Sequence, residues 1–204
     1  ELAVTRWRED CTQDNWGTFC YLQNLETGKY WSNMHQPTLK KGEKYEAAFS
    51  QSRVDFHTLY NEIECHTEIV VSPEDDIEMR RVTITNCSNI RKTIAITSYA
   101  ELVIAPAASD IIQPAFSNLF VQTEILPSQH TILCTRRPRS VEEKAPWMFH
   151  LLSMEGKHAE EISYETDRMK FIGRGNTSQH PEAMKNLDKL SGSQGSVLDP
   201  IAAI

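Results

Sequence analysis

The feature that most constrains the fold is a strict alternation of side chains between residues 63 and 71. One set of alternating positions is mostly apolar and the other is polar: Ile63, Cys65, Thr67, Ile69 and Val71 against Glu64, His66 and Glu68. Because successive side chains of a strand point to opposite faces of a sheet, this pattern is typical of a half-buried β-strand. Similar runs occupy residues 54–60, 77–85 and 93–103. We therefore predict a meander of four consecutive antiparallel strands.

Further short runs rich in β-branched and aromatic residues predict more strands. Strands are expected at residues 18–22, 29–32 and 45–50, and hairpins at residues 120–136 and 147–166. About ten or more strands exceed a small barrel, so the sequence predicts an all-β fold of two large antiparallel sheets stacked face to face.

Helical periodicity is scarce in this chain, and few short helices are expected. A short helix is predicted at residues 182–190, inside a segment (176–196) that we expect to be a loop or a short helical excursion. Residues 104–118 are rich in Ala, Pro and Ser and are predicted to form a loop. A loop of that length in a compact sandwich is often functional.

Length and charge narrow the class of protein. The chain has 204 residues, which favours a single domain over residues 1–204. Its 21 basic and 28 acidic residues give a net charge of −7, which argues against a nucleic-acid partner. No run of about 18 apolar residues is present, so no membrane insertion by this segment is expected. The chain starts without Met and stops just after an apolar run, and we interpret it as a fragment of a longer protein.

The sequence shows no signal for a metal, a disulfide framework or a cofactor. The five cysteines are scattered and never form a CxxC pair, which favours reduced thiols and no metal site. No phosphate-binding or dinucleotide-binding glycine motif occurs, so no cofactor is expected. The arginine run at residues 136–139 could attract phosphate, although basic residues on loops more often form a solvated face.

Two clusters of aromatic and polar residues are candidate carbohydrate-binding sites. The first contains Trp7, Arg8 and Glu9, ahead of the first strand, and the second contains Tyr30, Trp31 and Gln36. An indole face packs against the C–H face of a pyranose, while guanidinium and carboxylate groups hydrogen-bond to neighbouring hydroxyls. The alternative for both clusters is ordinary structure: buried aromatic rings in the core, and arginine–carboxylate pairs that tie down an edge.

A series of short motifs in order along the chain resembles glycoside hydrolase family 94, formerly glycosyltransferase family 36, and specifically the cyclic β-1,2-glucan synthases. The motifs lie at residues 4–10, 16–17, 21–22, 28–32, 36–37, 71–76, 78–82, 85–86, 97–101, 114–117, 120–124, 136–140, 164–168, 171–175 and 198–201. The resemblance spans nearly the whole chain. It implies a galactose-mutarotase-like supersandwich, which agrees with the strand count reached from the residues alone.

The resemblance also implies a parent protein and its partners. The parent would be a very large enzyme at the cytoplasmic face of the bacterial inner membrane, with a glycosyltransferase module and a phosphorylase-like module, and this segment would be a soluble part of it. In the family, the catalytic acid lies on an α/α toroid that follows the sandwich, so no residue of this chain is assigned a catalytic role.

Three hypotheses of function follow. The first is a non-catalytic, carbohydrate-associated domain that binds or positions β-1,2-glucan or another glucan. The second is a purely structural module that packs on the adjacent α/α toroid or forms a homodimer interface, and it predicts that Trp7 and Trp31 are buried. The third, an independent mutarotase-type epimerase, would need a His and a carboxylate converging in one cleft.

Overall fold

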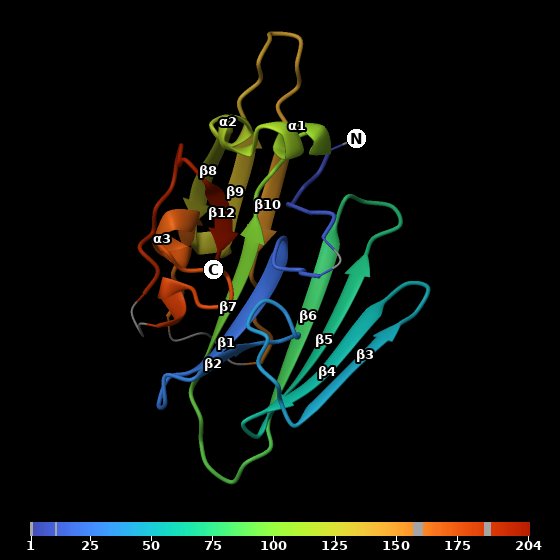
Figure 1. The fold of residues 1–204 in the computed structure, drawn as a ribbon, viewed down its shortest axis with the longest axis vertical. Helices are drawn as coiled ribbons and strands as arrows, with labels where there is room; N and C mark the ends of the chain where they lie inside the picture. The colour runs from blue at the N-terminus through green and yellow to red at the C-terminus, as the bar shows by residue number, and fades with distance from the viewer. Residues whose placement is uncertain (1, 11, 157–160, 186–188) are drawn as a thin grey trace. The chain divides into compact units, whose positions relative to one another are not determined.

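The computed structural model describes residues 2–10, 12–156, 161–185 and 189–204 (Figure 1). The chain divides into two compact units. The terminal unit comprises Glu1–Phe19 and Thr97–Ile204, and the central unit comprises Cys20–Ile96. Two strands, β1 (Thr18–Asn24) and β7 (Ile94–Glu101), cross the boundary along the chain. The single domain expected over residues 1–204 stays a prediction.

The all-β class is confirmed. The described residues form twelve strands, and the strand pairs are antiparallel. The remaining ten are β2 (Tyr30–Ser32), β3 (Lys44–Phe49), β4 (Val54–Tyr60), β5 (Ile63–Val71), β6 (Glu78–Asn86), β8 (Val121–Leu126), β9 (Thr131–Arg136), β10 (Trp147–Leu151), β11 (Glu165–Asp167) and β12 (Pro200–Ala203).

The central unit is built on a four-stranded sheet in the order β3-β4-β5-β6. The alternation predicted at residues 63–71 is seen here, because Ile63 and Cys65 are fully buried while the intervening side chain of Glu64 is half-buried. Ile63 and Cys65 pack with Leu22 and Trp31 into the core of this unit. All six residues of the edge strand β3 are exposed.

The predicted meander is correct for β4, β5 and β6 but not for the fourth strand. We expected residues 93–103 to continue the meander, whereas β7 pairs with β12, with Glu101 opposite Ile201. The fourth strand of the sheet is β3 instead, which pairs with β4. A spacing of about ten residues indicates that a strand exists, but it does not determine which neighbour a strand takes.

The terminal unit contains a three-stranded sheet in the order β10-β9-β8 (Figure 1), and β11, β12 and most of β7, which are consecutive strands of another sheet. Its core combines residues of β8, β9 and β12 with residues just outside strands: Leu102, Ile104, Val121, Ile132, Cys134, Tyr164, Ala202 and Ile204. The predicted hairpin at residues 120–136 is confirmed as β8 and β9. The predicted hairpin at residues 147–166 is wrong, because β10 pairs with β9 and β11 pairs with β12.

Short helices connect these strands, and two of them correct the sequence interpretation. The segment expected to be a loop contains α1 (Ala107–Ile112) and α2 (Pro114–Asn118). Proline begins α2, a position where its missing N–H removes no helical hydrogen bond.

A third helix, α3 (Arg168–Ile172), starts after Asp167, whose carboxylate accepts a hydrogen bond from the Met169 N–H. Two single 3₁₀ turns, η1 (Pro127–Gln129) and η2 (Glu182–Met184), complete the helical elements. The helix expected over residues 182–190 is present only as η2 in the described part, and residues 186–188 lie outside it. None of the helices in the described ranges is long and apolar enough to cross a membrane.

Candidate functional site

The first candidate cluster lies on the extended N-terminal segment, which is anchored to the residues after β7. Ala3 and Ala105 form an antiparallel bridge, and the Val103 N–H donates to the Val4 carbonyl at 3.1 Å. Further along this segment, Arg6 is buried whereas Trp7 is 67% exposed. The segment therefore inserts one side chain into the terminal unit and holds the next one out in solvent.

Arg6 is the centre of a buried charge network. Its Nη2 lies 3.0 Å from Asp110 Oδ1, and its Nη1 lies 3.5 Å from Glu101 Oε2. Arg8 donates to the other Asp110 oxygen at 2.6 Å. Arg168 donates to Glu101 Oε1 at 3.1 Å. Each of the two carboxylates is thus paired with two arginines.

The pKa shifts of these groups follow from their burial and their partners. Burial alone would raise the pKa of Asp110, but the hydrogen bonds from Arg6 and Arg8 outweigh it and hold the pKa below its usual range. Burial raises the pKa of Glu101, and the charges of Arg168 and Arg6 offset only part of that shift. Both carboxylates serve to bind arginines, which makes this network a structural anchor for the N-terminal segment.

Trp16 lies against the same network. The guanidinium carbons of Arg6, Arg8 and Arg168 lie 5.3, 5.5 and 5.5 Å from the centre of its ring. Guanidinium groups at this distance are attracted to the electron-rich ring face. The indole therefore lies next to arginines of the N-terminal segment and of α3.

The exposed ring of Trp7 borders a small recess of about 50 Å³. Thr5, Arg8 and Asp110 contribute its polar walls, and the other lining residues are apolar: Ala3, Val103, Ala107 and Ile111. A liquid water molecule occupies about 30 Å³, so the recess holds a hydroxyl group or a water molecule and not a sugar ring. A ligand larger than that would bind across the exposed indole face.

Of the three residues in the first cluster, Trp7 and Glu9 are exposed and Arg8 is half-buried. The structure therefore places an aromatic face, a guanidinium and a carboxylate on consecutive positions of one anchored segment. These are the three residue types that the sequence analysis expects at a carbohydrate contact. That they contact a carbohydrate stays a prediction.

The second cluster lies in the central unit and is largely buried. Trp31 is 2% exposed and stacks on Tyr60 with ring centres 5.0 Å apart. Tyr30 is half-buried beneath the Lys40 ammonium, which lies 3.7 Å from its ring centre. Gln36, also half-buried, precedes Pro37 in a cis peptide bond. The indole of Trp31 has no open face for a pyranose, in agreement with the alternative of a core residue.

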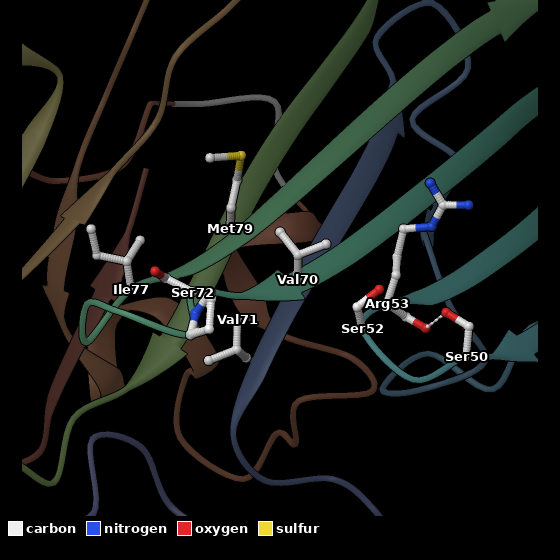
Figure 2. A pocket seen from close by; sticks show the side chains of 9 residues that line it. Ser50, Ser52, Arg53, Val70, Val71, Ser72, Ile77 and Met79 are labelled. Carbon is white, nitrogen blue, oxygen red and sulfur yellow. Dashed lines mark hydrogen bonds between the residues drawn. The ribbon is translucent and has the colours of Figure 1, made fainter.

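A pocket of about 460 Å³ in the central unit lies between the β3–β4 turn and the β5–β6 hairpin (Figure 2). Its apolar wall includes Val70, Val71, Ile77 and Met79. Its one charged lining residue, Arg53, is already paired with carboxylates outside the lining. The pocket offers apolar contact but no uncommitted charged group.

Sequence reasoning missed a group of potential metal ligands on β4 and β5. One ligand atom each from Asp55, His66 and Glu68 lies within 4.8 Å of the others. Asp55 and Glu68 are direct cross-strand partners, and the hairpin between two alternating runs was the signal that could have paired them. Arg53 contacts both carboxylates, at 2.9 and 3.0 Å, and so supplies the positive charge that a metal ion would bring.

The same group bears on the epimerase hypothesis. His66 Nε2 and Asp55 Oδ1 lie 3.0 Å apart, so a His and a carboxylate do converge. Neither residue lines either of the two pockets described above. The pair lies on the adjacent strands β4 and β5, outside both of these pockets.

The fold defines a mostly-β domain of antiparallel sheets, and comparison with known proteins shows which family it belongs to. The family model "Glycosyl hydrolase 94, supersandwich domain" matches residues 1–204. The chain belongs to this family.

Two relatives illustrate the range of the family. The chain is 34% identical over 202 residues to the cyclic beta-(1,2)-glucan synthase NdvB of Rhizobium meliloti (strain 1021), a match that covers 99% of this chain and 7% of that protein. It is 34% identical over 109 residues to an N,N'-diacetylchitobiose phosphorylase of Vibrio furnissii, covering 52% of this chain and 14% of that protein. The chain thus spans a small part of the relatives that it matches.

Proposed function

We propose that this chain is a non-catalytic, carbohydrate-associated domain of a cyclic β-1,2-glucan synthase, and that it binds or positions the glucan. The likeness to the glucan synthase over 99% of the chain supports the parent enzyme. The parent would act at the cytoplasmic face of the bacterial inner membrane, with the catalytic α/α toroid as the neighbour of this domain. No cofactor enters this role.

The observation that carries the proposal is the exposed indole of Trp7 on a rigidly anchored segment. An aromatic ring that is 67% exposed would normally be free to move, but the neighbouring Arg6 is held by two buried carboxylates. A segment whose backbone is anchored before binding loses less conformational entropy when a side chain on it stacks on a sugar. Arg8 and Glu9 flank the ring and can hydrogen-bond to the hydroxyls of that sugar.

The test is a calorimetric titration of the 204-residue chain with β-1,2-gluco-oligosaccharides, with cello-oligosaccharides as the linkage control. Trp7→Ala is the test variant and Trp147→Ala is the matched control, because Trp147 is 68% exposed. We expect saturable binding of the β-1,2 series that is weakened about tenfold or more by Trp7→Ala, as for the loss of one buried aromatic contact. Trp147→Ala should leave the affinity unchanged.

Two results would contradict the proposal. The first is no binding heat from the folded chain at millimolar ligand. The second is equal binding by the wild type and Trp7→Ala, which would show that the sugar contacts other residues.

A second candidate function, a scaffold that packs on the catalytic toroid or on a second copy, is favoured by a different surface. Alternate residues of β10 form an exposed apolar row: Trp147, Phe149 and Leu151 are 68%, 58% and 53% exposed. Such a row on a sheet face is typical of a protein contact. This function predicts that Trp147→Ala weakens binding of a separately produced toroid domain or weakens dimerisation. It also predicts that the titration with oligosaccharides gives no binding heat.

A further inference from the structure

A second cluster of arginines in the terminal unit differs from the Arg6 network because, among the described residues, none of its members forms an ion pair with a carboxylate. Arg136 ends β9, and Arg137 and Arg139 follow it. Their guanidinium carbons lie 5.3, 5.5 and 5.0 Å from the centre of the Phe120 ring. Three positive charges are therefore gathered around one aromatic ring.

The charge of Arg136 is buried, and in the described part of the chain no carboxylate forms a direct ion pair with it. Its side chain is nearly inaccessible, with the residue 5% exposed, and it donates to the Ser117 carbonyl and hydroxyl oxygens at 2.9 and 3.2 Å. Both of these acceptors are neutral. Within the described ranges, no carboxylate oxygen lies within 4.0 Å of a guanidinium nitrogen of Arg136, Arg137 or Arg139. Buried charges in proteins are normally paired, so this one stands out.

The surroundings make the lack of an anion costly. Burial lowers the pKa of Arg136, the charge of Arg139 lowers it further, and only the charge of Glu143 opposes these effects. The Glu143 carboxylate itself accepts a hydrogen bond from the backbone N–H of Arg139 at 2.6 Å. It is thus engaged by the main chain, while the side chains of Arg137 and Arg139 are exposed to solvent.

We propose that the exposed Arg137 and Arg139, next to the buried charge of Arg136, form a binding site for an oxyanion of the phosphate type beside Phe120. A phosphate group carries up to two negative charges and several acceptor oxygens, which match guanidinium forks from more than one arginine. A single carboxylate would balance only one of the three charges. The site is independent of the proposed glucan contact, because it uses other residues and a charged ligand.

The phosphate could be free or esterified to an organic group, and Phe116 distinguishes the two sources. Its ring is 51% exposed, packs edge-on against Phe120 with centres 5.3 Å apart, and has the Arg139 guanidinium carbon 5.8 Å from its centre. A sugar phosphate bound to the arginines could place its ring on Phe116. Inorganic phosphate would make no use of that ring.

The experiment is a calorimetric titration of the 204-residue chain with inorganic phosphate and with glucose 6-phosphate at low ionic strength. Glucose and chloride serve as the neutral and monovalent controls. Arg139→Gln is the test variant because Arg139 is exposed and its removal leaves the buried Arg136 contacts with Ser117 in place. Arg174→Gln removes an exposed arginine outside the cluster and is the matched control.

We expect saturable phosphate binding that weakens about tenfold in Arg139→Gln, because one charge-assisted hydrogen-bond donor is lost, and that is unchanged in Arg174→Gln. Added chloride should weaken it by screening. A further loss in Phe116→Ala for glucose 6-phosphate alone would support an esterified ligand, and equal behaviour of Phe116→Ala and wild type would support free phosphate. The proposal is overturned if no saturation occurs up to about 10 mM phosphate, or if Arg139→Gln and Arg174→Gln bind equally well.

Discussion

Replacing Arg6 by methionine is expected to lower the free energy of unfolding by about 3 kcal/mol. Arg6 is 6% exposed and lies 3.0 Å from the Asp110 carboxylate and 3.5 Å from that of Glu101. Removing one partner of a buried ion pair destabilises a protein by about 3–5 kcal/mol, because the charge left behind is neither solvated nor paired. Here each carboxylate keeps a second arginine, Arg8 or Arg168, so the lower end of that range applies.

The assay is equilibrium unfolding in urea, followed by tryptophan fluorescence, together with a thermal melt. For a chain of this size each kcal/mol lowers Tm by about 2–4 °C, so Arg6→Met should melt roughly 6–12 °C below the wild type. Trp16 lies 5.3 Å from the Arg6 guanidinium, so its emission reports on the network directly. Arg174→Met, at an exposed arginine, should change the free energy of unfolding by less than about 0.5 kcal/mol.

A double-mutant cycle separates the ion pair from general packing. Asp110→Asn removes the charge that Arg6→Met leaves with Arg8 as its remaining arginine partner, so the double variant should lose at least about 1 kcal/mol less than the sum of the two single losses. A loss below about 1 kcal/mol in Arg6→Met, or simple additivity in the cycle, would refute the view that this network anchors the N-terminal segment.

Two further predictions concern titratable groups. Because the folded-state pKa of Asp110 lies below the ordinary value of 3.8, its ionised form contributes stability at neutral pH that disappears as the pH falls below about 4. The difference in unfolding free energy between wild type and Asp110→Asn should therefore be largest at pH 7 and shrink towards pH 2. A difference that does not depend on pH would contradict this. Burial raises the pKa of the Cys134 thiol to about 12, whereas Cys87 is exposed, so a thiol reagent at pH 8 should modify Cys87 in the folded chain and Cys134 only after unfolding. Peptide mass mapping reads out both sites, and equal labelling rates in the native chain would speak against the buried environment.

Local patterns determined what could be predicted of the fold. The alternation around Ile63 and Cys65 identifies a strand and its buried face because both depend on neighbouring residues. The pairing of Glu101 with Ile201 joins segments about a hundred residues apart, and no local pattern encodes it. The same holds for the hairpin wrongly expected at residues 147–166, whose two strands pair with other strands instead.

In the candidate site, too, residue types could be predicted from the sequence, whereas burial and long-range partners could not. Trp7 and Trp31 both stand among polar residues, yet one is exposed and the other is buried. The difference depends on what packs against each ring, which the sequence does not display. The acidic partner of Arg6 is likewise 104 residues away, at Asp110, in a segment with no charge pattern that would indicate it.

The exposed edge strand β3 has a consequence for handling this chain at high concentration. Among the described residues β3 pairs with β4 on one side only, so a row of backbone N–H and C=O groups remains along its outer edge. Such an edge can recruit a strand from another molecule, and proteins discourage this with charged side chains. Lys44 and Glu46 are the charges on β3, and they neutralise each other at 3.3 Å, while Tyr45 and Phe49 are exposed beside them. The edge is therefore weakly protected against self-association, and the chain will be easier to keep monodisperse when β3 is covered.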